Sequence, residues 1–239
     1  MLRRIAQELR DRVHRRRSAD RLPPNPWQEA QNAFMIHCLA DYDVTLKGVI
    51  HVGGHLGEEY SIYKRAGARR IAFFEPLPDL FDALRRRFEN TEDVVLINRA
   101  LGARNEVREM NIGRGGREST SFLRPTTLYD GCFEEQRLPL EIVTLDSWVR
   151  TDPHGNEYNM LVTDTQGFDL EVLKGSQETL HQIEYIYTEV SNGHYEGEPT
   201  VEQFDAFLAP FGFIRKDMSL YGSWKGQDAW GDLFYARRR

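Results

Sequence analysis

The chain has 239 residues, of which 40% are hydrophobic and 11% aromatic, and its net charge is −6. This length and composition fit one α/β domain, which we place at residues 27–239, and make two domains cramped. No apolar stretch is long enough to span a bilayer and no secretory signal is apparent, so we expect a cytoplasmic protein. Cys38 and Cys132 are far apart and predict neither a disulfide framework nor a zinc site.

Residues 1–26 differ in charge from the rest of the chain. Through Arg21 there are eight arginines against three acids, a net charge of +5, which leaves −11 for the remainder. Apolar residues recur at helical spacing over residues 2–17, and a proline-rich break at residues 22–26 ends this basic helical arm. We expect the arm to pack on its own body or on a second copy in a homo-oligomer rather than on a membrane, and the acidic body argues against nucleic acid.

The most informative stretch is residues 48–75, which follows a lead-in helix at residues 27–47. An apolar run reaches Gly53, Gly54 and Gly57, a helical segment follows, and a second apolar run ends on Glu75. This pattern predicts a β-α-β unit in which the glycines let the backbone approach a ligand closely and the acid accepts hydrogen bonds from ribose hydroxyls. The pattern favours a loop that binds a nucleoside-containing ligand. The alternative is that the glycines only form a tight turn between strand and helix.

The glycine spacing distinguishes between nucleoside ligands. A dinucleotide fingerprint has glycines at the first, third and sixth positions, which residues 53–57 do not match. S-adenosylmethionine has no phosphate and needs only the close backbone approach and the ribose acid, so it is favoured. If the backbone at Gly53 is ordinary β, Gly53→Val should block this cofactor with little loss of fold.

Further strands and helices alternate along the chain. Helices are predicted from Pro78 through Phe88, over residues 168–175 and over residues 200–209. Strands are predicted at residues 94–97, 160–163 and 183–188, with an inserted hairpin and loop built from residues 107–112 and 119–123. Residues 212–216 and 232–236 should form an antiparallel hairpin at the sheet edge. The alternation indicates a doubly wound, mostly parallel sheet.

Polar residues stand at the carboxyl ends of the predicted strands, where an open α/β sheet binds its ligands. They are His51 and Gly53, Glu75, Asn98, Asp164 and Glu189. Each could separately be a helix cap or a turn residue, but their joint placement predicts one site.

At this point the chain resembles the FkbM-type family of S-adenosylmethionine-dependent methyltransferases. The matching stretches are residues 49–59, 73–76, 98–101, 119–123, 143–146, 164–175 and 187–190. The resemblance implies a Rossmann-like, seven-stranded class I methyltransferase fold, to which the helical spacing of residues 2–17 adds an N-terminal helical extension. It also implies methyl transfer to a hydroxyl of a small-molecule or glycan acceptor, typically a sugar or secondary metabolite.

The resemblance implies a set of cofactor contacts: His51, Gly53, Gly54, His55, Gly57, Glu75, Pro76, Asn98 and Asp164. Two residues depart from the family pattern. Many members have an acid in place of His51, expected to help bind the amino group of the methionine part, and many have Glu where Gln166 stands. We interpret Gln166 as the mark of a subgroup.

Methyl transfer to a hydroxyl needs a proton acceptor. Asp164 is our first candidate by position, and His194 is the second because its ordinary pKa suits the task, although a solvent-exposed loop residue is the alternative reading. Glu189 lies on the neighbouring strand. Asp164 and Glu189 could also hold a divalent metal, but acids at strand ends more often bind a cofactor or cap a helix, so no metal site is assigned.

Two other functions fit parts of this pattern. A nicotinamide-dependent oxidoreductase is opposed by the glycine spacing, and a catalytically silent subunit could keep the nucleoside pocket. N- or C-methylation also stays open, because loops around residues 113–140 and 191–225 carry no recognisable acceptor code.

Overall fold

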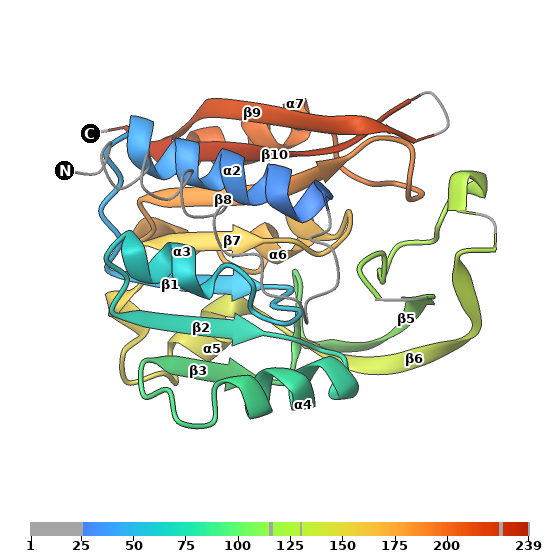
Figure 1. Ribbon diagram of the computed structural model, residues 1–239, viewed down its shortest axis with the longest axis horizontal. Coiled ribbons are helices and arrows are strands. Elements are labelled where there is room, and N and C mark those ends of the chain that lie inside the picture. The colour runs from blue at the N-terminus through green and yellow to red at the C-terminus, as the bar shows by residue number, and fades with distance from the viewer. Residues whose placement is uncertain (1–25, 115–116, 130, 225–226, 239) are drawn as a thin grey trace, which may run out of the picture.

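The computed structural model describes residues 26–114, 117–129, 131–224 and 227–238. Its centre is a seven-stranded sheet of order β3-β2-β1-β7-β8-β10-β9 (Figure 1). Five neighbouring strands are parallel, whereas β10 is antiparallel to both of its neighbours. The predicted mostly parallel sheet with an antiparallel edge hairpin is thus confirmed. The strands are β1 (Gly48–Val52), β2 (Arg70–Phe74), β3 (Val94–Ile97), β7 (Met160–Thr163), β8 (Tyr185–Ser191), β9 (Phe213–Trp224) and β10 (Gln227–Arg237).

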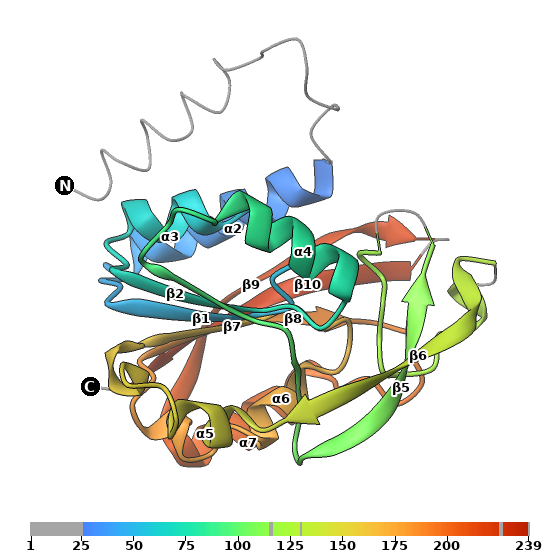
Figure 2. The same cartoon turned by 90° about the horizontal axis from the view of Figure 1, so that it is seen from below.

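Helices cover both faces of this sheet (Figure 2). On one face lie α2 (Pro26–Asp41), α3 (Tyr60–Arg65) and α4 (Pro78–Arg87), and on the other lie α5 (Leu145–Val149), α6 (Asp169–Lys174) and α7 (Val201–Leu208). Short 3₁₀ turns occupy Thr127–Tyr129, Gly155–Glu157, Thr179–His181 and Ala209–Phe211. The predicted basic arm lies outside the described residues, apart from Pro26, which begins α2.

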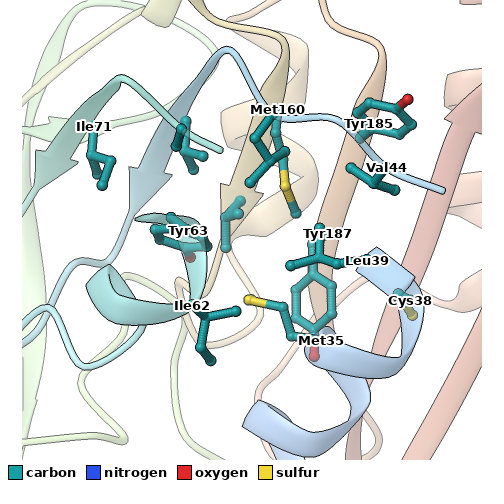
Figure 3. Packing of buried hydrophobic residues seen from close by; sticks show 14 of the residues in the cluster. Met35, Cys38, Leu39, Val44, Ile62, Tyr63, Ile71, Met160, Tyr185 and Tyr187 are labelled. Carbon is teal, nitrogen blue, oxygen red and sulfur yellow. The ribbon is translucent and has the colours of Figure 1, made fainter. Parts of the chain in front are cut away.

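Each face of the sheet has its own hydrophobic core because successive strand side chains point to opposite faces. On the α2 and α3 face, Met35 and Ile62 pack with Ile71 and Met160 from the strands (Figure 3). Ile50 and Val52 of β1 belong instead to the cluster on the α5, α6 and α7 face. The alternation in β1 therefore directs the intervening His51 towards α3, where its ring lies 5.9 Å from that of Tyr63.

The inserted segment forms a second sheet of order β4-β6-β5 beyond the carboxyl ends of β1, β2 and β7 (Figure 1). Its strands are β4 (Ala100–Leu101), β5 (Glu106–Gly113) and β6 (Phe133–Val143). The predicted hairpin partner was wrong: β5 pairs with β6, and residues 119–123 contribute only the bridge between Asn111 and Ser121. In β6, residues 134–137 are polar and exposed, so this part of the strand is set by pairing, whereas Leu138, Leu140 and Ile142 alternate towards a hydrophobic cluster.

Two predicted strand boundaries also need correction. The fifth strand does not end before Glu189, because β10 pairs with it as far as Ser191 opposite Trp230. The edge strands are longer than predicted, because β9 and β10 pair with each other as an antiparallel hairpin from Phe213 to Trp224. Within the described ranges, none of the helices is both long and apolar enough to cross a bilayer.

Candidate active site

A cavity of about 500 Å³ lies between the carboxyl ends of the parallel strands and the small sheet. It brings together most of the residues predicted from sequence: His51, Gly53, Gly54, His55, Glu75, Pro76, Asp164, Glu189 and His194. The remaining two, Gly57 and Asn98, are not among the lining residues. The convergence agrees with ligand binding at the carboxyl edge of an open α/β sheet.

Gly53 lets the loop after β1 lie directly against the end of β7. Its φ is +84°, and a Cβ at this position would lie 1.9 Å from the backbone oxygen of Asp164. The N–H groups of Gly53 and Gly54 both donate to the Phe74 carbonyl, at 3.0 and 2.9 Å. The loop is therefore fixed to both neighbouring strands, which leaves no room for a side chain at Gly53.

This geometry corrects the expectation that Gly53→Val would spare the fold. We expect the substitution to lower the free energy of unfolding by at least about 3 kcal/mol, since it combines a left-handed backbone with a backbone collision. Gly197→Ala is the matched control, because Gly197 has φ +76° but nothing within 4 Å of its Cβ position. It should cost about 1–2 kcal/mol. Urea denaturation of both variants measures the difference, and equal losses would contradict the steric argument.

Gly57 and Asn98 do not line the cavity, but they hold the segments that do. A Cβ on Gly57 would lie 2.7 Å from the Phe88 ring, so this glycine allows the loop to pack on α4. The Asn98 side-chain amide donates to the backbone oxygens of Glu75 and Pro76, at 2.9 and 3.2 Å. Asn98 thus fixes the end of β2, and its direct contact with a cofactor stays a prediction.

Glu75 is buried at the end of β2 and holds the loops on both sides of it. Its two carboxylate oxygens accept hydrogen bonds from the backbone N–H groups of His55 and Leu77, both at 2.9 Å. Burial raises the pKa of Glu75 to about 7, against the opposing effect of these hydrogen bonds. Each oxygen keeps a further lone pair that can accept a hydrogen bond from a hydroxyl group.

The partly buried Asp164 and the buried Glu189 form a carboxyl pair at the cavity. The side-chain nitrogen of Gln166 donates to both, at 2.8 Å to Asp164 and 2.7 Å to Glu189. Burial and the charge of Asp164 raise the pKa of Glu189 well above its usual range. Burial also raises the pKa of Asp164, so the two carboxyls titrate as one pair.

Gln166, which sequence reasoning took only as a subgroup mark, has a φ of +54° and connects three parts of the site. Besides donating to both carboxyls, its side-chain oxygen accepts from the Tyr195 hydroxyl at 3.3 Å. Its backbone oxygen accepts from the Ser121 hydroxyl at 2.7 Å. The residue therefore orients the carboxyl pair with respect to the inserted segment.

His194 is buried, with 3% of its surface exposed, so the alternative of a solvent-exposed loop residue is wrong. Its Nδ1 lies 3.3 Å from the Tyr129 hydroxyl, and within the described residues its buried Nε2 has no hydrogen-bond partner. Burial lowers its pKa, which keeps the ring neutral. The Glu198 carboxylate accepts from the backbone N–H groups of Gly193, His194 and Tyr195 and thereby fixes this loop.

The cavity has an apolar end under the small sheet and a polar end beside α3. The apolar lining comes from Leu77, Leu80, Ala100, Leu101, Met110, Phe122 and Phe168. Such a surface suits a flat heteroaromatic ring. The sequence pattern did not predict these residues as part of the site, nor Gln28, Tyr129 and Trp230, because apolar and neutral side chains carry no chemical signal until the fold brings them together.

The charged groups of the lining are mostly acidic. They are the acids Glu58, Glu59, Glu75, Glu118, Asp164 and Glu189 and the arginines Arg99 and Arg117. Both arginines are paired with acids, Arg99 with Glu141 at 3.1 Å and Arg117 with Asp79 at 3.0 Å. No three His, Cys, Asp or Glu side chains converge to hold a metal ion in the part of the chain that the structure describes.

Comparison with known proteins agrees with this geometry. A family model for the methyltransferase FkbM domain matches residues 51–215. A search of curated proteins found no match.

Two similar solved structures are methyltransferases. One is the magnesium protoporphyrin IX methyltransferase ChlM from Synechocystis PCC 6803 with bound S-adenosylmethionine (9% identity, TM-score 0.52, covering 88% of this chain and 79% of that one). The other is the N-methyltransferase NodS from Bradyrhizobium japonicum WM9 (6% identity, TM-score 0.52, covering 91% and 100%). At these identities the likeness shows the fold, which is the predicted Rossmann-like class I methyltransferase fold.

Proposed function

We propose that this chain, which belongs to the FkbM family of methyltransferases, transfers the methyl group of S-adenosylmethionine to a hydroxyl of a sugar or secondary metabolite. That it is an S-adenosylmethionine-dependent methyltransferase follows from the family and the fold. The hydroxyl acceptor and the roles of individual residues are the proposed part. We also propose that the protein acts in the cytoplasm.

The observation that carries the proposal is the convergence of three features on one cavity of about 500 Å³. Gly53 and Gly54 line this cavity, a buried carboxylate lies at Glu75, and a carboxyl pair lies at the end of β7 and in β8. The apolar end would hold the adenine ring and Glu75 the ribose hydroxyls. The rest of the cavity is left for the methionine part and an acceptor of small size.

The sulfonium supplies an activated methyl group when the cofactor is bound, so the protein has to align the acceptor oxygen, exclude water and remove one proton. We assign the removal of this proton to Asp164. It lines the cavity, and burial raises its pKa, which makes it a stronger base than a free aspartate. Gln166 holds it in one orientation and connects it to Glu189.

The acidic lining supports a neutral or cationic acceptor. A phosphorylated acceptor or nucleic acid would meet several carboxylates and only two arginines, both already paired. We also propose that the chain forms a homo-oligomer through its basic arm.

The direct test is titration of the purified protein with S-adenosylmethionine, S-adenosylhomocysteine and NAD by calorimetry. We expect binding of the first two and none of NAD. Binding of NAD alone would favour the oxidoreductase. Binding of S-adenosylhomocysteine without methyl transfer to any member of a panel of hydroxyl, amine and carbon acceptors would favour the silent subunit, and transfer to an amine or carbon would overturn the hydroxyl assignment.

A further inference from the structure

Glu59 stands just before α3 and turns its side chain into the polar end of the cavity. It occupies the cap position of that helix, but its carboxylate makes no capping hydrogen bond. Only 14% of the side chain is exposed. The residue is therefore a largely buried acid whose carboxylate is not used to cap its own helix by a hydrogen bond.

The described surroundings of Glu59 contain no charged counter-ion for it. Gln28 of α2 donates to Oε1 at 2.8 Å, and the Nδ1 of His51 lies 3.8 Å from Oε2. Burial lowers the pKa of His51 to about 4, so this ring is neutral, and its Nδ1 also lies 3.0 Å from the Tyr63 hydroxyl. Among the described residues, Glu59 forms no ion pair with lysine or arginine.

Of the other acids around the cavity, Glu58 and Glu75 each have two hydrogen-bonding partners. Glu58 lies 3.0 Å from the His55 ring and accepts from the backbone N–H of Leu56. Glu75 accepts two backbone N–H groups, and Asp164 and Glu189 share Gln166. Burying a carboxylate without a cation is costly, and burial next to Glu58 raises the pKa of Glu59 to about 7.

A second feature at the same place lacks a donor. An adjoining cavity of about 20 Å³ is lined by Asn32, Glu59 and Asp164 among others, and the buried Oδ1 of Asn32 has no hydrogen-bond partner in the described chain. A carboxylate without a cation and an amide oxygen without a donor both lie beside this end of the cavity. They fit a cationic group that carries several N–H donors, directly or through a water in the adjoining cavity.

We infer that Glu59, oriented by Gln28, binds the α-ammonium group of S-adenosylmethionine. The inference rests on the proposed cofactor and assigns a partner to one end of it. The acid then comes from the start of α3, which compensates for the histidine at position 51 of β1. The ammonium would supply the positive charge that the described protein does not.

The test compares two ligands that differ in the amino-acid part. S-adenosylhomocysteine carries the ammonium, whereas 5′-methylthioadenosine keeps the adenosine and the sulfur without it. By calorimetry, Glu59→Gln should weaken S-adenosylhomocysteine about 10- to 100-fold and change the affinity for methylthioadenosine less than about 2-fold. Asp82→Asn is the control, because it removes one negative charge from an exposed residue of α4 that does not line the cavity, and it should not alter the ratio of the two affinities.

A ligand-side measurement keeps the inference testable if Glu59→Gln does not fold. The wild-type protein should bind S-adenosylhomocysteine about 10- to 100-fold more tightly than its analogue without the amino group. Equal loss of both ligands in Glu59→Gln, an unchanged affinity for S-adenosylhomocysteine, or no discrimination against the deaminated analogue would each overturn the role of Glu59. Failure of the wild-type protein to bind any of these ligands would instead overturn the proposed cofactor.

Discussion

Asp164→Asn should lower the turnover of methyl transfer by about 100-fold or more while changing the affinity for S-adenosylmethionine only modestly. Asparagine keeps the size of the side chain but cannot accept a proton at neutral pH. It also disturbs the pair with Glu189 least among common substitutions, because an amide can still hydrogen-bond to a protonated carboxyl. The measurement is single-turnover transfer to a verified acceptor, with cofactor affinity determined separately.

The pH dependence gives a second measurement on the same site. Burial raises the pKa of Asp164, and turnover requires its ionised form, so wild-type turnover should fall with decreasing pH from a point above the ordinary aspartate value of about 4. In Asp164→Asn this acid limb should disappear. Retention of the same limb would assign the titration to another group.

His194→Ala is the comparison variant and should cost less turnover than Asp164→Asn. The His194 Nε2 is buried, so it cannot accept a proton from an acceptor without movement of its loop. If Asp164→Asn loses cofactor affinity but keeps turnover in the bound state, Asp164 is a cofactor ligand and His194 takes the role of base. If neither variant slows transfer, the proton leaves to water or through a metal, and a chelator in the same assay distinguishes these two.

Glu75→Ala should weaken S-adenosylmethionine binding by about 1.5–3 kcal/mol, or roughly 10- to 150-fold. The loss has two sources. The ribose hydroxyls lose their acceptor, and the N–H groups of His55 and Leu77 lose theirs, so the loops that surround the cofactor are no longer held together. Calorimetric titration gives the affinity, and a thermal melt of the same sample shows whether the fold survives.

Asp79→Ala is the control for Glu75→Ala because it removes a nearby acid that does not line the cavity. Asp79 lies in the first turn of α4, four residues after Glu75, and its exposed carboxylate pairs with Arg117 at 3.0 Å, so its loss should change affinity by less than about 1 kcal/mol. A folded Glu75→Ala variant with wild-type affinity would remove Glu75 from the cofactor site.

The sequence determined the sheet and the location of its ligand edge. Short apolar runs such as residues 49–52 and 71–74 are buried on both faces, which makes them visible without knowledge of their neighbours. The acid at the end of the second run and the glycines after the first are local requirements of a β-α-β turn. These signals lie within about thirty consecutive residues, so the chain order alone was enough to place them together.

Only the tertiary structure decided how the individual side chains are used. Gly53 touches Asp164, more than a hundred positions away in the chain, and Gln166 joins Asp164 to Glu189 on the next strand. The burial of His194 likewise depends on packing against segments distant in sequence. Hydrogen bonding and desolvation depend on neighbours in space, so the partners and pKa shifts of these groups are fixed only when the strands and loops assemble.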